Sequence, residues 1–288
     1  MRVTALCPSY QPLSTEADWI LPSGQPIQRY GLCALAQPYL RTAQQTPRFP
    51  FYEATLLLVL SGQLTIREQS ETTVIDTPSQ LCLITPDANA DLTKTPGGHN
   101  AVFRSLFLTF SSTLLARFHR HYPDEIAPVL RPSPFTPLAL DDDLIRTLQH
   151  LVGGITDNTL TASRLELRLM DMLLALSERG YHFGTPPLPG ISTQLRMLIS
   201  EEPDRHWTAQ YAGRLLAMSE ATLRRRLSAE QTRFDVLLLE TRLQHAMMLV
   251  QTTSWSIQRL AEACGYQSSA RFSERFKARF GCSPTKIR

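Results

Sequence analysis

Arginine and serine side chains recur at matching places in two segments near the C-terminus, about 50 residues apart. Residues 208–231 read TAQYAGRLLAMSEATLRRRLSAEQ, and residues 256–282 read SIQRLAEACGYQSSARFSERFKARFGC. Each segment begins with a Ser or Thr that can cap a short helix, passes through a tight turn, and continues into a Ser-capped helix that carries arginines. This order is typical of a helix-turn-helix unit, whose second helix enters the major groove of DNA. We call residues 208–231 the first unit and residues 256–282 the second unit.

The second helix of the first unit is predicted to present arginines to base edges. Leu223 and Leu227 are four residues apart and pack inward, which turns Arg224 and Arg225 outward in the N-terminal half of the helix. Arginine can donate two hydrogen bonds to O6 and N7 of guanine, whereas Arg226 lies on another side and is expected to meet a phosphate. The residues of this unit predicted to contact DNA are Ser219, Ala221, Thr222, Arg224, Arg225 and Arg226.

The second unit repeats this arrangement with fewer arginines. Gly265 suits the positive φ expected at its turn, and the next helix is expected to start near Ser268 or Ser269. Phe272 and Phe276 pack inward, while Lys277 and Arg279 can meet phosphates. The residues of this unit predicted to contact DNA are Ser269, Arg271, Ser273, Glu274 and Lys277.

Glu274 stands out because it places a carboxylate on a face that is otherwise suited to DNA. A phosphate would repel this group, but the carboxylate could accept a hydrogen bond from N4 of cytosine. It could equally be a surface charge that pairs with Arg271 or Arg275.

Residues 234–251 join the two units and are predicted to form one continuous helix. Its apolar positions suit packing on both sides. About 17 residues with a rise of about 1.5 Å each give a length of roughly 25 Å. With the widths of the flanking helices added, the two recognition helices could lie about 34 Å apart, which is one turn of DNA. The alternative is a helical bundle that has no role in DNA binding.

These segments resemble the AraC/XylS family of bacterial transcription regulators over residues 192–288. The matching stretches include MSEATLRRRLSAE from Met218, RLQHAMMLV from Arg242, the run from Ile257 to Gly281, and GCSP from Gly281. The resemblance implies a DNA-bound activator that recruits RNA polymerase. Two departures, Gln231 in place of the usual Gly and Glu274 in place of a common Arg, prevent an operator sequence from being carried over.

Composition and charge fit such a protein. The length of 288 residues predicts two domains. Residues 191–288 hold 15 Lys and Arg against 9 Asp and Glu, a net charge of +6, whereas residues 1–190 carry a net charge of −3. A basic C-terminal third is the charge pattern of a nucleic-acid-binding module. No run of 18 apolar residues and no apolar stretch near Met1 occur, so we expect a cytoplasmic protein without a membrane span.

The first 110 residues are predicted to form short β-strands at 54–60, 63–69, 72–76, 80–85 and 101–110, separated by Gly and Pro turns. This pattern favours a barrel or a sandwich. The stretches from Leu57 and from Pro78 resemble the cupin-type regulatory barrel of the same family. Metal-binding cupins carry histidines that residues 48–54 lack, so we expect no metal, no cofactor and no enzymatic activity.

A small molecule is the expected input to this barrel. Arginines and a lysine could bind its carboxylate, although the same residues could instead be solvated or fill their own core. A protein partner that binds the barrel is an alternative, and an enzyme fused to a DNA-binding domain is a weaker one. The candidate effector-binding residues are Arg41, Arg48, Tyr52, Lys94 and Arg104.

Residues 111–182 are predicted to be helical and to mediate homodimerisation. Apolar residues of the helix predicted at 160–181 are spaced three and four apart, which is the pattern of a seam between paired helices. The alternative is a helix packed on its own barrel. The seam residues are Leu165, Leu169, Met172 and Leu176. The whole prediction is an α+β protein with a cupin-like barrel at 1–110, a helical dimerisation segment at 111–182, a linker at 183–190 and about seven helices at 191–288.

Overall fold

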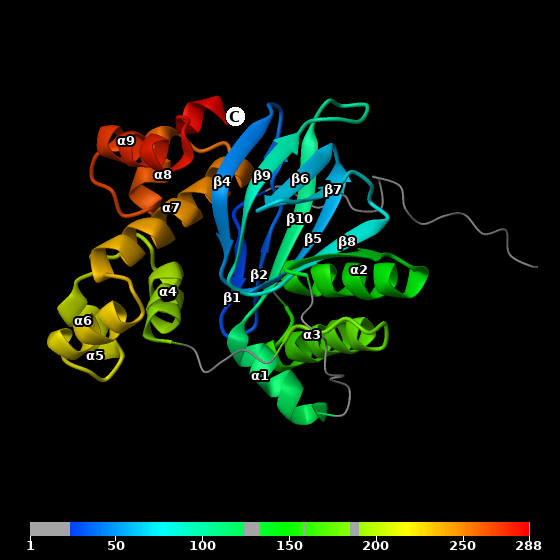
Figure 1. Ribbon diagram of the computed structural model, residues 1–288, viewed down its shortest axis with the longest axis horizontal. Coiled ribbons are helices and arrows are strands. Elements are labelled where there is room, and N and C mark those ends of the chain that lie inside the picture. Colours follow the sequence, from blue (N-terminus) through cyan, green and yellow to red (C-terminus); the bar gives the residue numbers. More distant parts are fainter. Residues whose placement is uncertain (1–23, 124–132, 158, 185–189, 288) are drawn as a thin grey trace, which may run out of the picture.

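The computed structural model describes residues 24–123, 133–157, 159–184 and 190–287, and it shows two parts in contact (Figure 1). The N-terminal part, residues 24–184, contains the strands and three α-helices, and the C-terminal part, residues 190–287, is helical. This mixed α/β architecture agrees with the predicted succession of strands and helices. Most of the predicted linker, at residues 185–189, lies outside the described residues. No described helix combines the length and apolar character needed to cross a membrane.

The N-terminal part is a pair of antiparallel sheets, and no strand pairing between them closes the described strands into the predicted barrel. The larger sheet has the order β1-β2-β10-β5-β8-β11, with β3 pairing β10, and the smaller has the order β4-β9-β6-β7. The larger sheet contains β1 (Ile27–Arg29), β2 (Cys33–Ala36), β3 (Tyr39–Leu40), β5 (Ala54–Ser61), β8 (Gln80–Ile84), β10 (Phe103–Phe110) and β11 (Phe135–Ala139). The smaller sheet contains β4 (Gln44–Phe51), β6 (Gln63–Glu68), β7 (Glu71–Ile75) and β9 (Ala88–Thr95).

Strand β5 lies inside the larger sheet and is buried along its whole length. Successive side chains of a strand point to opposite faces, and here both faces are covered. Leu56 and Leu58 belong to the core beneath the helices, whereas Leu57 and Val59 belong to the core shared with the smaller sheet. The uninterrupted apolar run of β5 follows from this double burial.

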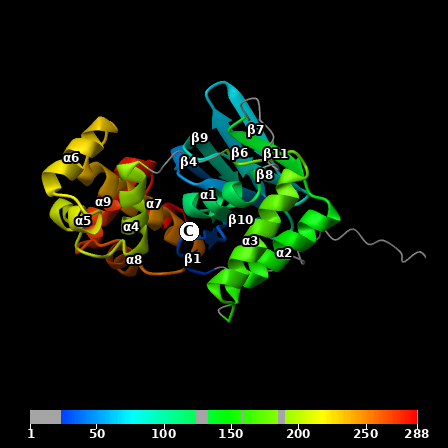
Figure 2. The ribbon, with the colours of Figure 1, turned by 90° about the horizontal axis from the view of Figure 1, so that it is seen from below.

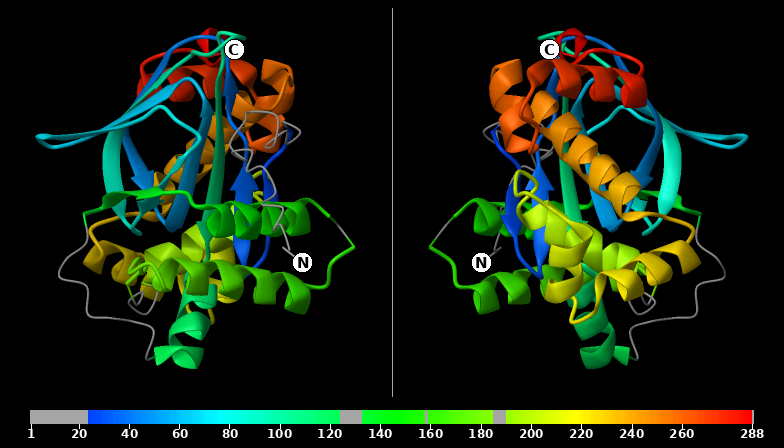
Figure 3. Two further views of the ribbon diagram at one scale, coloured as in Figure 1. Left: turned by 90° about the vertical axis from the view of Figure 1, so that its right-hand side faces the viewer. Right: turned by 90° about the vertical axis from the view of Figure 1, so that its left-hand side faces the viewer.

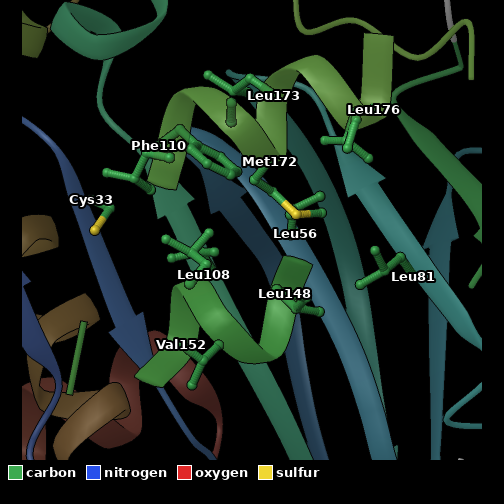
Figure 4. Packing of buried hydrophobic residues seen from close by; sticks show 14 of the residues in the cluster. Cys33, Leu56, Leu81, Leu108, Phe110, Leu148, Val152, Met172, Leu173 and Leu176 are labelled. Atoms are coloured by element: carbon green, nitrogen blue, oxygen red, sulfur yellow. The ribbon is translucent and has the colours of Figure 1, made fainter. Parts of the chain in front are cut away.

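Helices cover the outer face of the larger sheet. They are α1 (Ser112–His121), α2 (Asp142–Thr156) and α3 (Ala162–Ser177). Ser111, Asp141 and Thr161 cap their N-termini by accepting a hydrogen bond from a backbone N–H three residues later. Figure 4 shows side chains of α2 and α3 meeting those of β5, β8 and β10 in one apolar core.

The predicted dimerisation seam on α3 is wrong, because its side chains lie in this core. Leu165, Leu169, Met172 and Leu176 are at most 3% exposed and pack beside residues of the larger sheet and α2. The spacing of three and four residues therefore marks the face that α3 turns to its own sheet, which was the alternative interpretation. These four side chains are not available to a second subunit.

The C-terminal part has a long helix with a compact group of helices at each end. Helix α7 spans the two groups, with α4–α6 near its N-terminus and α8 and α9 near its C-terminus (Figure 1). The helices are α4 (Ile191–Glu201), α5 (Ala209–Leu215), α6 (Glu220–Ala229), α7 (Phe234–Thr252), α8 (Ile257–Ala263) and α9 (Ser269–Phe280), followed by the 3-10 helix η3 (Pro284–Lys286).

The two ends of α7 belong to different apolar cores. Phe234 and Leu237, at its start, pack with α4–α6. Met247 and Val250, near its end, belong to a cluster that contains α8, α9 and the residues between the two sheets. Figure 3 shows α7 lying across the strands of the N-terminal part, and Figure 2 shows the C-terminal helices on the opposite side of the sheets from α2 and α3. The second unit is therefore docked on the N-terminal part.

Candidate nucleic-acid interface

The first unit has the local geometry of a helix-turn-helix. The Thr208 hydroxyl accepts a hydrogen bond from the Tyr211 N–H at 3.1 Å and caps α5. The turn to α6 passes through Ala217 at a φ of 52°, and the Met218 N–H donates to the Gly213 carbonyl at 2.9 Å. A Cβ on Gly213 would lie 2.9 Å from the Met218 carbonyl oxygen, so this close crossing of α5 and the turn requires glycine.

The second unit repeats these contacts. The Ser256 hydroxyl accepts from the Arg259 N–H at 3.2 Å and caps α8. The chain turns at Gly265 with a φ of 73°, and the Tyr266 N–H donates to the Ala261 carbonyl at 2.9 Å. The two units thus share the same turn, although a glycine adopts the left-handed conformation in one and an alanine in the other.

Helix α6 places its arginines in solvent, as its apolar spacing predicts. Ser219 caps the helix by accepting from the Thr222 N–H at 3.2 Å, while Leu223 and Leu227 are fully buried. Arg224 is exposed and forms an ion pair with Glu220 at 2.8 Å. The other residues predicted to contact DNA are exposed or half-buried on the outer side of the helix: Ala221, Arg225 and Arg226 are exposed, and Thr222 is half-buried.

Helix α9 presents a mixed outer face. Its cap is Ser268, which accepts from the Arg271 N–H at 3.3 Å, so Ser269 is the first helical residue. Phe272 and Phe276 are fully buried. Of the residues predicted to contact DNA, Ser269, Arg271, Glu274 and Lys277 are exposed and Ser273 is half-buried.

Arg279, predicted to meet a phosphate, is held by other protein groups. Its Nε donates to Glu240 Oε2 on α7 at 2.9 Å. Its two terminal nitrogens donate to the backbone carbonyls of Pro47 and Arg48 on β4, at 3.2 and 3.1 Å. The last turn of α9 is therefore fastened to the N-terminal part, and the guanidinium of Arg279 is occupied there.

Arg242, in the middle of α7, contacts segments from both ends of the C-terminal part. Its Nε donates to the Pro203 carbonyl and its Nη2 donates to the Arg205 carbonyl, both at 2.9 Å, in the loop between α4 and α5. The guanidinium also packs against Gly265, where a Cβ would overlap it. The sequence did not predict a role for Arg242, because the residues next to it in the sequence give no sign that its side chain contacts Pro203 and Gly265, about 39 and 23 residues away.

The candidate effector-binding residues do not converge on one site. Arg48 and Tyr52 line an open cavity of about 570 Å³ between the two parts, together with Arg196, Glu240 and Arg279. Burial raises the pKa of the Tyr52 hydroxyl, although the Arg196 guanidinium over its ring at 4.2 Å opposes this shift. Arg41 instead lies over the ring of Tyr39, and Arg104 is half-buried on β10. The described residues contain no cluster of three His, Cys, Asp or Glu that could hold a metal ion.

Lys94 is also separate from that cavity. It lies on the buried face of β9, where its ammonium donates to Gln251 Oε1 on α7 at 2.7 Å. Gln251 in turn donates to Gln44 on β4 at 2.6 Å. Sequence reasoning missed both glutamines, since isolated polar residues in amphipathic segments are usually solvated.

Comparison with known proteins agrees with the geometry of the two units. Residues 213–288 match the family model of a helix-turn-helix domain. The HTH-type transcriptional regulator YdeO of Escherichia coli K12 is 34% identical over 97 residues, which are 34% of this chain and 38% of YdeO. GadX of the same strain is 33% identical over 98 residues, which are 34% of this chain and 36% of GadX. The chain thus matches less than half the length of these relatives, and the resemblance of residues 192–288 to AraC-type regulators is confirmed.

Solved structures share the fold of both parts. The apo form of a ToxT point variant from Vibrio cholerae superposes with a TM-score of 0.60 at 14% identity, covering 88% of this chain and 96% of ToxT. Wild-type ToxT bound to an unsaturated fatty acid has a TM-score of 0.57 at 14% identity, covering 90% and 95% of the two chains. The order of a two-sheet part followed by a helical part is therefore that of a known fold.

Proposed function

We propose that this protein is a sequence-specific DNA-binding transcription regulator whose two units enter successive major grooves. The observation that carries the proposal is the pair of equivalent capped turns, joined by the single helix α7, with arginines exposed on α6 and polar residues exposed on α9. The similarity of this part to YdeO and GadX, both transcriptional regulators by name, supports it. The net charge of +6 over residues 191–288 favours binding to a polyanion.

The proposed contacts differ between the units. Arg224 and Arg225 of α6 read base edges, and Arg226 contacts a phosphate. On α9, Ser269, Arg271 and Ser273 lie toward bases and Lys277 toward a phosphate. Arg224 must leave its ion pair with Glu220 to bind guanine, which costs little because an exposed pair contributes at most about 1 kcal/mol.

The proposal includes control through the N-terminal part. The second unit is docked there by Arg279 and by a shared apolar core, so an input that loosens this docking would change the freedom of α9. The cavity between the parts is lined by Arg48 and Arg196, whose guanidinium groups suit a small molecule with a carboxylate. Asp87 and Glu240 also line it, and Glu240 is paired with Arg279. A ToxT structure holds a fatty acid, which is such a molecule.

The remaining elements of the proposal concern partners. We propose a cytoplasmic activator that recruits RNA polymerase and acts as a homodimer. Because the apolar seam of α3 is buried, the dimer contact would use another surface. Sedimentation of the full chain tests the dimer directly, since monomers at micromolar concentration would exclude it.

Selection of duplexes from a random pool by the full chain tests DNA reading. The proposal predicts enrichment of a two-part motif and at least about a thousandfold preference for it over random DNA at physiological salt. Equal affinity for selected and random duplexes would contradict it. Leu223, which is fully buried in the first unit, provides a control, because Leu223→Asp should abolish selective binding by unfolding α6.

A further inference from the structure

Arg242 links the loop that leads into the first unit to the turn of the second unit through one guanidinium group. The loop that it holds, at Pro203 and Arg205, lies between α4 and α5 and so precedes the first unit. Gly265, against which it packs, is the turn of the second unit. Helix α7 carries Arg242 between them, and the side chain is half-buried. Rotation of one unit about α7 relative to the other would break at least one of these contacts.

A planar guanidinium is needed for this arrangement. Its fixed fork directs Nε and Nη2 at two carbonyls while its flat surface lies against the backbone at Gly265. An ammonium is a compact group and cannot reproduce both hydrogen bonds with the same packing. A side chain at position 265 would displace the guanidinium, because its Cβ would also lie 2.8 Å from the Pro203 carbonyl.

We propose that Arg242 is a positioning residue that fixes the distance and rotation between the two recognition helices, and thereby the spacing of the two DNA elements that the protein accepts. This inference rests on the proposed function. It assigns Arg242 no contact with DNA.

The test uses the full chain and the duplex that it selects, with zero, one, two or three base pairs inserted between the two elements. One base pair adds about 34–36° of rotation, so the wild-type protein should lose about tenfold in affinity at the first insertion. Arg242→Lys should lose about threefold or less at the same insertion, while its affinity for a duplex with one element stays near the wild-type value. The matched control is Arg146→Lys on α2, an exposed arginine that should keep the wild-type profile.

The inference would be overturned if the affinity of Arg242→Lys depended on the number of inserted base pairs in the same way as that of the wild type, even at a lower overall affinity. Arg242 would then have only a general role in folding. Circular dichroism and thermal unfolding identify a variant that fails to fold, and Arg242→Gln then provides the second measurement. Absence of selective binding by the wild-type chain would instead refute the proposed function. The two failures are distinguishable, because the Arg242 inference alone fails when the wild-type chain binds selectively and the variant has the same spacing profile.

A second, independent observation is the buried polar group formed by Lys94, Gln44 and Gln251 where α7 covers the sheets. Lys94 is 9% exposed and the two glutamines are 3% exposed. Lys94 shares a face of β9 with Ala88, Ala90 and Leu92, so its side chain extends along the apolar core. The ammonium contacts Gln251 Oε1 and lies 5.9 Å from the centre of the Phe103 ring.

Charged groups on the surrounding elements lie elsewhere. Strand alternation turns Asp91, Arg67 and Arg104 to the opposite faces of β9, β6 and β10. Glu68 shares a face of β6 with Leu64, which pairs with Lys94, but it lies four residues farther along the strand. Glu240 of α7 pairs with Arg279 of α9, and Asp91 accepts from the backbone N–H of Arg48. Lys286 of η3 is exposed. Among the described residues, no charged group competes with burial in setting the protonation of Lys94.

We propose that Lys94 makes the docking of α7 on the N-terminal part dependent on pH. Undocking of α7 would give the ammonium access to water, whereas docking encloses it with one neutral hydrogen-bond acceptor. Burial lowers the pKa of Lys94 from 10.5 to about 7 in the docked state. Between pH 7 and pH 10.5, Lys94 is mostly neutral in the docked state and protonated in the undocked state, so docking releases a proton. The docking equilibrium therefore becomes more favourable as the pH rises through this range. Below pH 6 Lys94 is protonated in both states, and docking changes little with pH.

Hydrogen exchange of the full chain, corrected for the intrinsic effect of pH, tests this inference at residues 247–252. Protection in the wild-type protein should rise by about fiftyfold between pH 7 and pH 9, as expected for a pKa of about 7 docked and 10.5 undocked. Lys94→Met should remain protected with little change across this range. Lys286→Met removes an exposed lysine nearby and should retain the wild-type rise. An identical pH profile in wild type and Lys94→Met, or a flat wild-type profile, would overturn the inference.

Discussion

The two units share one local geometry but differ in what surrounds them. The first unit packs with α4 and the start of α7 in a core of its own. The core of the second unit continues into the space between the two sheets of the N-terminal part. A signal received by the N-terminal part would therefore have a direct physical route to α9 and only an indirect one, through α7, to α6.

The arginines of the two recognition helices also differ in whether the N-terminal part holds them. Arg225 and Arg226 of α6 are exposed. Arg279 of α9 is bound to Glu240 and to two carbonyls of β4. In the docked state, therefore, the first unit has these two arginines exposed to solvent, whereas the second unit has one of its cations engaged by protein.

The largest effect should come from removing a core side chain of either unit. Phe276→Ala should cost about 3–5 kcal/mol and Leu223→Ala about 2–5 kcal/mol of unfolding free energy, because both side chains are fully buried. Hydrogen exchange in denaturant should show that Phe276→Ala also loosens β4 and β9, while Leu223→Ala loosens only α4–α6. Equal loosening of the sheets by both variants would remove the distinction between the two cores.

Arg225→Ala should weaken binding to the selected duplex by about 1–3 kcal/mol and relax the preference at one base pair. Arg226→Ala is the paired control, since loss of a phosphate contact lowers affinity on all sequences alike. Binding to a panel of single-base variants of the duplex measures both. An unchanged base preference in Arg225→Ala would show that this arginine does not read a base.

Release of the second unit should strengthen DNA binding. Glu240→Gln removes the carboxylate that holds Arg279, and a partly exposed ion pair of this kind contributes at most about 1 kcal/mol, so affinity should rise about two- to fivefold. Glu71→Gln, at the exposed first residue of β7, removes the same charge without touching the docked surface. The same rise in both variants would mean that net charge, and not release of Arg279, is responsible.

Lys277→Ala should have the smallest effect on affinity at about 200 mM salt and the clearest effect on the salt dependence, because a phosphate contact contributes most at low salt. Loss of one phosphate contact reduces the slope of log affinity against log salt by about 1. Titrations of the selected duplex between about 50 and 200 mM salt measure this slope. A slope equal to that of the wild type would place Lys277 away from the phosphates.

Local patterns in the sequence predicted the helical part well. The inward pairs Leu223 and Leu227, and Phe272 and Phe276, are buried because four-residue spacing places side chains on one helix face. The starts of β5, β6 and β8 are also where the sequence placed them. Gln231, at a position where glycine is usual in the family, adopts a φ of 56°, which explains that usual preference.

Local sequence patterns could not predict the features that depend on contacts between residues far apart in the sequence. Residues 44–51, which form β4, contain two prolines, and the hydrophobic alternation of β9 is weak because Lys94 occupies an inward position. The seam of α3 has the same spacing whether it faces a second helix or its own sheet, and only tertiary packing decides between them. Arg279 and Arg242 carry no local mark of the carbonyls that they bind.

Hydroxyl-radical footprinting of the full chain and of Glu240→Gln on the selected duplex shows whether both units contact DNA and whether docking restrains the second one. We predict two protected patches about one helical turn, or about 10 base pairs, apart. Protection at the second patch should be weaker in the wild-type protein than in Glu240→Gln, while the first patch is the same in both. A single continuous patch, or protection that does not differ between selected and random DNA, would contradict this claim.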